Sequence, residues 1–404
     1  MKKIAKLSLV AAVAVAGLTT ANAQPLEEAI KNVEVSGSVV YRYNDSRNDA
    51  TGAVANPTST TNNYKVGLNL ASKVNEDVKF NSRFVVGQPA TNNLSTGSDG
   101  DNGFASLDSS VNGDQNVGVA LSHAYFGYTG LQNTTVNVGK QGLTTPWTVA
   151  IDSDGNEQTG TGILALSTMG PVTLAGAYFN QTNLDDSGDV NIGTGAEDIA
   201  TVGVIGVAGP ATLDAWYIDA QDILDSYTIG AKAAFDVSAI KMGVDARFTS
   251  LELDAANSTD NSLAKIVLTA DAGLVDGKIA YAMTDKEGGI AALDNDAVTN
   301  LLGWSLSANN HADADYWQAV LGFDILSNLN LSANYGNLQY VDPTVATTDI
   351  EEEEIYAQLL YKMSKNLTTY VRYGTYTRET SAVGVATVEN NDDVRGRLQV
   401  EYTF

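Results

Sequence analysis

Few residues in this chain could catalyse a reaction. It contains no cysteine and only two histidines, His123 and His311. A Ser-His-Asp hydrolase would need one of them as its base, and no serine stands in the G-x-S-x-G turn that many such enzymes use. The absence of cysteine also excludes thiol nucleophiles and Cys-based zinc or iron–sulfur sites. We therefore predict that the protein is not an enzyme.

One group of potential ligand oxygens lies in segment 142–160, GLTTPWTVAIDSDGNEQTG. Asp152, Asp154 and Glu157 stand close together there, and the segment has no Lys or Arg. Calcium prefers closely spaced oxygens, although the twelve-residue EF-hand loop with its distal Glu is missing. Three uses of these acids stay open: a calcium site that includes Asp152 and Asp154, an electric field acting on solutes, or an ordinary solvated loop.

The overall charge limits the partners. Among 404 residues, 23 are Lys or Arg and 48 are Asp or Glu, so the formal net charge is −25. Binding to nucleic acid needs clustered basic residues that neutralise phosphates, so nucleic acid is not expected as a partner. Charged residues make up 18% of the chain, below the roughly 25% that is usual for a soluble domain.

Residues 1–23 have the pattern of a cleaved export signal peptide. Lys2, Lys3 and Lys6 precede a short apolar run at 7–18, and small residues at 21–23 form a peptidase site. The run is shorter than the roughly 20 residues that cross a bilayer as a helix. We expect a mature chain at 24–404 whose formal charge, without those three lysines, changes from −25 to −28.

The mature chain alternates apolar and polar residues with a period of two. At 394–404, apolar residues and glycine occupy the even positions and polar residues the odd ones, so a strand there has one apolar and one polar face. Eighteen segments have a strand pattern of this kind. They lie at about 33–43, 62–72, 78–86, 118–129, 134–141, 161–168, 172–181, 199–208, 211–220, 225–235, 240–249, 262–272, 277–285, 315–324, 329–336, 353–362, 367–376 and 394–404.

The connections between these segments alternate between short and long. Short turns follow the even-numbered segments, and mostly long polar stretches such as 87–117 and 286–314 follow the odd-numbered ones, with 221–224 as a short exception. This arrangement is typical of outer-membrane barrels, which have short periplasmic turns and long outward loops. The sequence therefore predicts an all-β fold, a transmembrane antiparallel β-barrel of about 18 strands.

A water-soluble β-sandwich would also alternate, with its apolar face as the core. Two features favour the barrel. Tyrosine and phenylalanine recur near the strand ends on the apolar face, as in interfacial girdles. The chain also ends on an apolar-face aromatic, Phe404, which resembles the carboxyl-terminal signal that the barrel-assembly machinery recognises.

A closed barrel of about 18 strands would enclose water. Side chains fill the interior of a barrel of about eight strands, but the interior of a barrel of 16–18 strands is too wide for them to fill. Alternation places seven basic residues on the inward face of strands that become neighbours when the barrel closes. They are Arg42, Lys65, Lys79, Arg83, Arg372, Arg395 and Arg397. One wall of the predicted channel is therefore basic, and we call these seven residues the basic wall.

Several segments resemble the Campylobacter-type major outer membrane porins. They are PLEEAIKNVEVSG at 25–37, YRY at 41–43, GKQGL at 139–143, WT at 147–148, ID at 151–152 and GTG at 160–162. The resemblance implies an 18-stranded, homotrimeric general diffusion porin. Some members carry calcium at the constriction, and Asp152 falls where the family's Ile-Asp pair lies, although Ser153 follows where the family has glycine.

In general porins the third loop folds into the lumen. If segment 142–160 does so, with Trp147 as an anchor, then Asp152, Asp154 and Glu157 face the basic wall across a constriction. Rings of acids favour cations, and acidic outer loops, including Asp349 and the run 351–354, would add to that preference. We predict weak to moderate cation selectivity.

The expected function is passive diffusion of ions and small hydrophilic solutes across the outer membrane of a Gram-negative bacterium. No cofactor is required on this interpretation, and calcium stays an option. Two alternatives are a substrate-selective outer-membrane channel and a barrel that acts through its loops as an adhesin or structural anchor.

Overall fold

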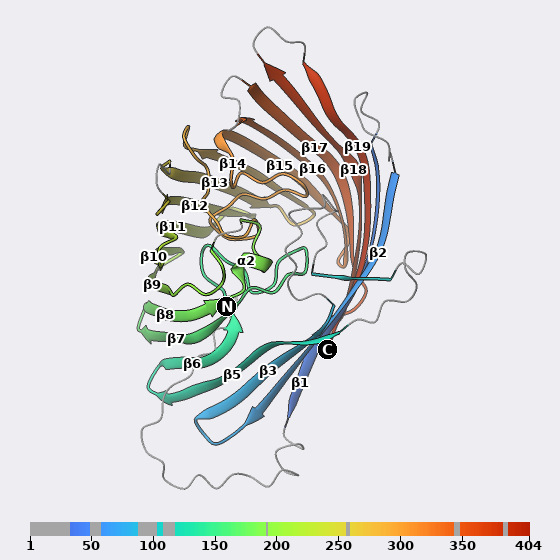
Figure 1. Ribbon diagram of the computed structural model, residues 1–404. Coiled ribbons are helices and arrows are strands. Elements are labelled where there is room, and N and C mark those ends of the chain that lie inside the picture. Colours follow the sequence, from blue (N-terminus) through green and yellow to red (C-terminus); the bar gives the residue numbers. More distant parts are fainter. Residues whose placement is uncertain are drawn as a thin grey trace.

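The computed structural model describes residues 33–48, 58–87, 103–107, 118–190, 193–255, 259–342, 348–382 and 387–404. The predicted signal peptide lies outside these residues. Eighteen long strands and the two-residue β4 form a single antiparallel sheet that closes on itself (Figure 1). No helix in the described part of the chain is long and apolar enough to cross a membrane.

The strands reproduce the eighteen predicted segments and extend many of them. Their bounds are β1 Glu34–Asn48, β2 Thr58–Lys73, β3 Val78–Val86, β4 Ala105–Ser106, β5 Val119–Leu131, β6 Thr134–Gly142, β7 Thr159–Met169, β8 Val172–Thr182, β9 Ile199–Ala208, β10 Ala211–Ala220, β11 Leu224–Val237, β12 Ile240–Leu253, β13 Asn261–Asp271, β14 Val275–Thr284, β15 Ala312–Leu326, β16 Leu329–Val341, β17 Thr348–Lys362, β18 Leu367–Ala382 and β19 Val388–Thr403. One short helix, α2, spans Leu184–Ser187.

Closure joins the first strand to the last. β1 pairs with β2 on one side and with β19 on the other. Beyond β19, Gly37 and Phe404 exchange two backbone hydrogen bonds of 2.9 and 3.0 Å. In lipid an open sheet edge would leave its N–H and C=O groups unpaired, so closure is what allows this sheet to span a bilayer.

Short turns and long loops alternate along the chain, as predicted. The turns include 74–77, 132–133, 170–171 and 363–366, and the connection at 221–223 is the expected short exception. Following the chain, we call 143–158 loop three and 285–311 loop seven. Large apolar side chains are exposed on the outer face, for example Val202, Leu213 and Ile229, as a lipid-facing surface requires.

Loop seven departs from the sequence analysis, which treated it as one of the long outward loops. It folds into the barrel, where Leu301 and Leu306 pack with Leu263, Tyr316 and Leu338 in a buried apolar cluster. Figure 1 shows loop segments and α2 inside the ring of strands. Part of the polar inward face is therefore covered by apolar loop residues, which alternation along the strands does not reveal.

The seam where β1 meets β19 leaves no room for a side chain at position 37, and this can be tested. A Cβ at this position would lie 2.2 Å from the backbone oxygen of Gly67 and 2.8 Å from the Phe404 ring, whereas a Cβ at Gly206 on β9 meets nothing within 4 Å. We expect Gly37→Ala to lower the free energy of unfolding by about 1–3 kcal/mol through overpacking. Gly206→Ala should change it by less than about 0.5 kcal/mol. Urea unfolding followed by tryptophan fluorescence compares them, and equal stability of the two variants would contradict the seam geometry.

Candidate functional site

Loop three crosses the lumen from one wall to the other. On one side Trp147 is fully buried, and its Nε1 donates a 2.8 Å hydrogen bond to Ser226 Oγ on β11. On the other side the loop's second half contacts β1, β2 and β3. These strands lie far from β11 around the sheet, so the loop forms a bar across the bore. The prediction that the third loop folds into the lumen is confirmed.

Glu157 fixes this bar to the strands. Its carboxylate accepts from Lys65 Nζ at 2.8 Å and from Arg83 at 2.7 to 3.0 Å, and its side chain is completely buried. Burial alone would raise the pKa of Glu157, but hydrogen bonds from Arg83 and the charge of Lys65 outweigh it and lower the pKa to about 2. The contribution of this ion pair to stability is therefore present above the ordinary pKa near 4.5 and is lost as the pH falls toward 2.

Arg42 ties the tip of loop three to the closure seam. Its guanidinium donates to the Ser153 carbonyl at 2.6 Å and to Gln399 Oε1 at 2.9 Å, and it lies 4.2 Å from the Phe104 ring centroid. Asp154 is 3.8 Å away and is partly exposed. Arg42 is therefore a buried junction between loop three, β19 and the segment 103–107.

Loop seven forms a second bar beside loop three. Asp296 accepts hydrogen bonds from the backbone N–H and the hydroxyl of Ser153, at 3.0 and 2.8 Å. On the strand side, Glu354 of β17 accepts from the N–H groups of Trp304 and Ser305. The two loops thus brace each other and the wall, which sets the width of the passage between them.

Arg372 of β18 lies beside Trp304 of loop seven, among aromatic rings. Its Cζ is 4.8 Å from the Tyr370 ring centroid, 5.7 Å from that of Tyr356 and 5.8 Å from that of Trp304. Its register partner on β19 is Arg397. Like charges opposite each other on neighbouring strands destabilise a sheet, so this pair is better explained by a role in the channel than by stability.

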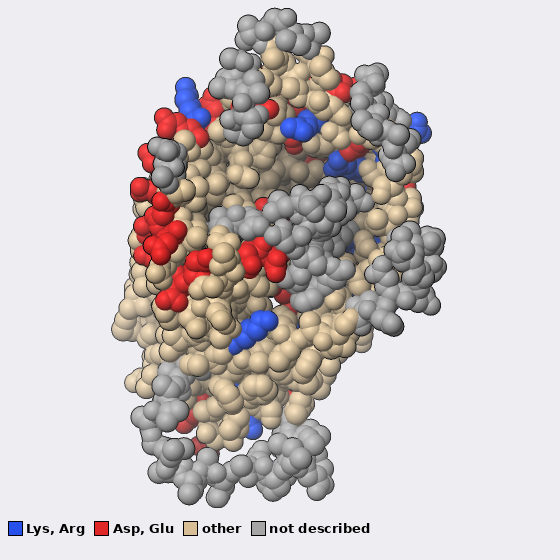
Figure 2. Space-filling view, in the orientation of Figure 1, with Lys and Arg blue, Asp and Glu red and all other residues tan. Residues whose placement is uncertain are grey.

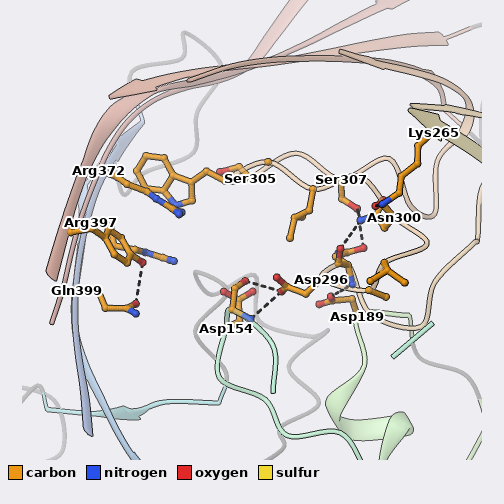
Figure 3. A pocket seen from close by; sticks show the side chains of 18 of the residues that line it. Asp154, Asp189, Lys265, Asp296, Asn300, Ser305, Ser307, Arg372, Arg397 and Gln399 are labelled. Carbon is orange, nitrogen blue, oxygen red and sulfur yellow. Dashed lines mark hydrogen bonds between the residues drawn. The ribbon is translucent and has the colours of Figure 1, made fainter. Parts of the chain in front are cut away.

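A cavity of about 610 Å³ lies among these elements, and charged residues of both signs line it (Figure 3). Arg372, Arg397 and Gln399 stand on the strand wall, while Asp154 and Asp296 come from loops three and seven. The far wall adds three charged residues, namely Lys232, Asp245 and Lys265. The face shown in Figure 2 also carries Asp and Glu around the opening and along the rim beside β9 to β12.

Carboxylates from three loops meet beside this cavity, and of these Asp152 and Asp294 are buried whereas Asp189 is exposed. Burial and the nearby charge of Asp189 raise the pKa of Asp152 to about 7, against the hydrogen bonds from Asn156. Burial, with the charges of Asp152 and Asp189, raises the pKa of Asp294 to about 9. At neutral pH Asp294 therefore holds its proton. Because the folded state keeps that proton and the unfolded state does not, its contribution to stability falls as the pH rises from about 4 to 9.

The structure divides the predicted basic wall into three groups. Arg42, Arg372 and Arg397 line the cavity. Lys65 and Arg83 are buried under loop three, and Arg395 bonds to Ser305 Oγ of loop seven at 2.6 Å. Lys79 lies apart near the 74–77 turn, where it is exposed and pairs with Glu34 at 2.8 Å.

The predicted acids are also divided. Glu157 is neutralised by direct ion pairs, so it anchors loop three and does not face the wall across open space. Asp152 is buried, and its two oxygens accept hydrogen bonds from Asn156. Of the three predicted acids, Asp154 alone lines the 610 Å³ cavity.

Sequence reasoning missed Asp189, Asp296, Lys232 and Lys265, which also line the cavity. The available signal was the composition of 290–306, where a tryptophan and several alanines and leucines are unusual for a solvated loop. The interpretation of run 351–354 as an outer loop was wrong. These residues belong to β17, and Glu352 and Glu354 are buried.

The described residues offer no preformed metal centre, since no three His, Cys, Asp or Glu side chains in them converge as ligands. Asp152 is engaged with Asn156, and Asp154 faces Arg42. Calcium binding by Asp152 and Asp154 does not fit this arrangement without rearrangement, and it stays a prediction from the resemblance.

Comparison with known proteins decides the family. The model of the Campylobacter major outer membrane protein family matches residues 1–404, the whole chain. The chain belongs to this family. It is an outer-membrane porin-type channel, and the expected resemblance is confirmed. A search of curated proteins found no match.

Solved structures with the same fold are outer-membrane proteins of low sequence identity. Acinetobacter baumannii OccAB3 superposes with a TM-score of 0.73 at 16% identity, over 93% of this chain and 99% of that chain. A BenF-like porin from Pseudomonas fluorescens Pf-5 gives 0.72 at 17%, over 93% and 99%. Pseudomonas aeruginosa OpdQ gives 0.70 at 15%, over 92% and 99%. At these identities the likeness establishes the fold of this porin.

The ion pairs of Glu157 can be tested against an exposed pair of the same kind. We expect Glu157→Gln to lower the free energy of unfolding by about 3–5 kcal/mol, because it leaves Lys65 and Arg83 buried without a counter-charge. Loop three should loosen, so unit conductance and current noise should rise. Glu34→Gln removes the exposed pair with Lys79 and should change stability by at most about 1 kcal/mol. If Glu157→Gln and Glu34→Gln give the same free energy of unfolding in urea and the same conductance in bilayer recordings, Glu157 does not anchor loop three.

Proposed function

We propose that this porin lets ions and small hydrophilic solutes diffuse passively through a constriction bounded by loops three and seven and by β1, β18 and β19. The observation that carries this proposal is the 610 Å³ cavity with arginines on one side and loop carboxylates on the other. Opposed charges produce a transverse field, which acts strongly where low-dielectric walls focus it. Such a field orients dipolar solutes and disfavours apolar ones.

Cation selectivity should be weak to moderate because the charges that line the cavity nearly balance. The bases are Arg42, Lys232, Lys265, Arg372 and Arg397, and the acids are Asp154, Asp189, Asp245 and Asp296. The cavity alone therefore gives no cation preference. The formal charge of the proposed mature chain, −25 − 3 = −28 without Lys2, Lys3 and Lys6, supports a negative mouth that attracts cations.

Reversal potentials in a salt gradient test this balance. We expect Asp296→Asn to shift the reversal potential toward the anion side, because the acidic side loses a charge, and Arg397→Gln to shift it toward the cation side. Unit conductance should persist in both variants. Shifts of the same sign, or a clearly anion-selective parent channel, would contradict the proposal.

Bilayer recordings also separate the alternative functions. A folded protein without conductance would favour the adhesin or anchor. If one class of solute, added at rising concentration, changes the ion current in a saturable way, a substrate-selective channel is favoured. The aromatic rings of Tyr356, Tyr370 and Trp304 lie around Arg372. They support the substrate-selective alternative, since they place aromatic faces beside a cation at the cavity.

The resemblance and the sequence supply the rest of the proposal. We propose a homotrimer in the outer membrane of a Gram-negative bacterium, exported through signal peptide 1–23. The carboxyl-terminal Phe404 would present the assembly signal to the barrel-assembly machinery. The seam position of Phe404 against Gly37 is compatible with recognition before the barrel closes, when β1 has not yet paired with β19.

Calcium dependence has a direct test. We expect the calcium chelator EGTA to leave unit conductance and thermal stability unchanged, because Asn156 already occupies both oxygens of Asp152. A change on chelation that added calcium reverses, and that Asp152→Asn abolishes, would instead support the calcium site that the resemblance implies. Magnesium added at the same concentration serves as the control.

A further inference from the structure

The charged residues around the 610 Å³ cavity, which we call the main cavity, differ in how they are paired. Asp154 lies 3.8 Å from Arg42, and Asp245 lies 2.9 Å from Lys232. Within each of these pairs the two charges compensate each other. A solute in the cavity would therefore interact mainly with charged groups that have no counter-charge beside them, provided that they are accessible.

Arg372 of β18 is an accessible positive group of this kind. Its Nε donates to Gln358 Oε1 at 2.5 Å, but it forms no ion pair with any residue that the structure describes. Its side chain is half-buried, and its two terminal nitrogens have no hydrogen-bond partner in that part of the chain and are not enclosed. Its register partner Arg397 borders the same cavity. A guanidinium in this state is suited to a carboxylate, which it can bind through two parallel hydrogen bonds.

Asp296 of loop seven is an accessible negative group of the same kind. Its Oδ2 accepts hydrogen bonds from the N–H and the hydroxyl of Ser153, and no Lys or Arg among the described residues forms an ion pair with it. The other oxygen, Oδ1, has no partner within those residues and is not enclosed. Asp189 also borders the cavity, near Asp296 (Figure 3). This part of the cavity is therefore suited to an ammonium group.

Aromatic rings border the main cavity next to Arg372. Trp304 of loop seven and Tyr370 of β18 are half-buried there, and their ring centroids lie 5.8 and 4.8 Å from the Arg372 Cζ. Val298 and Leu302 of loop seven add apolar surface. Aromatic rings pack favourably against one another. A volume of about 610 Å³ is in the usual range for small-molecule sites, so a solute with an aromatic ring can be accommodated.

We propose that the main cavity is a binding station for zwitterionic amino acids with an aromatic side chain. Arg372, with Arg397 beside it, receives the carboxylate, Asp296 receives the ammonium group, and Trp304 and Tyr370 contact the ring. A solute with a single charge could use only one of the two charged groups and would leave the other without a counter-charge. The inference rests on the proposed channel function and adds a substrate class to it.

The experiment compares L-phenylalanine with 3-phenylpropionate, which lacks the ammonium group, and with 2-phenylethylamine, which lacks the carboxylate. Each is added at rising concentration to single channels in a planar bilayer near neutral pH. We expect L-phenylalanine to reduce the ion current saturably, at concentrations at least about tenfold lower than either analogue, since each analogue loses a charge-assisted hydrogen bond. L-Alanine, which lacks the ring, should also be at least about tenfold weaker.

Two variants separate the roles of the charged groups. Arg372→Gln should weaken the L-phenylalanine effect about tenfold without weakening that of 2-phenylethylamine, because this amine has no carboxylate to lose a contact. Asp296→Asn should weaken the L-phenylalanine effect by a similar factor without weakening that of 3-phenylpropionate. Lys241→Gln and Asp271→Asn are the matched controls, because they make the same changes of charge in an exposed pair that does not border the cavity. Both should leave the L-phenylalanine effect unchanged.

The comparison of ligands on the parent channel tests the station even if a variant does not fold. Equal potency of L-phenylalanine and either single-charge analogue would overturn the proposal, and so would equal losses in the cavity variants and the control variants. An L-phenylalanine effect no stronger than that of L-alanine would overturn it as well, since the rings would then contribute nothing. Absence of conductance in folded protein would overturn the channel function itself.

Discussion

In a bilayer every backbone N–H and C=O group of the spanning segments has to be paired within the protein, and the rest of this structure depends on that constraint. The sheet meets it by closing β1 onto β19, with Gly37 and Phe404 completing the seam. Eighteen long strands then enclose a bore too wide for their own side chains to fill. The outer face must be apolar, and the inner face is left with polar and charged groups that need water or partners.

Two loops provide many of those partners and occupy part of the bore. Loop three is held by Trp147 on one side and by Glu157 on the other, and loop seven braces it through Asp296. A buried carboxylate is costly unless it is paired, and two basic partners compensate Glu157. The charge that fixes the loop is therefore compensated by direct ion pairs, whereas Asp154 and Asp296 line the main cavity.

The sequence by itself determined the barrel, because a period of two and the alternation of short and long connections follow from local strand geometry and from the lipid on one face. It also identified Arg42, Arg372 and Arg397 as lumen residues and segment 142–160 as the inward loop. The tertiary structure alone decided that Glu157 is an anchor, that loop seven enters the bore, and that Asp189 and Asp296 join the cavity. Those outcomes depend on contacts between residues far apart in the sequence: Arg83 lies 74 positions from Glu157, and Ser153 lies 143 positions from Asp296. Periodicity along one strand carries no information about which distant loop will fill the space that the strands enclose.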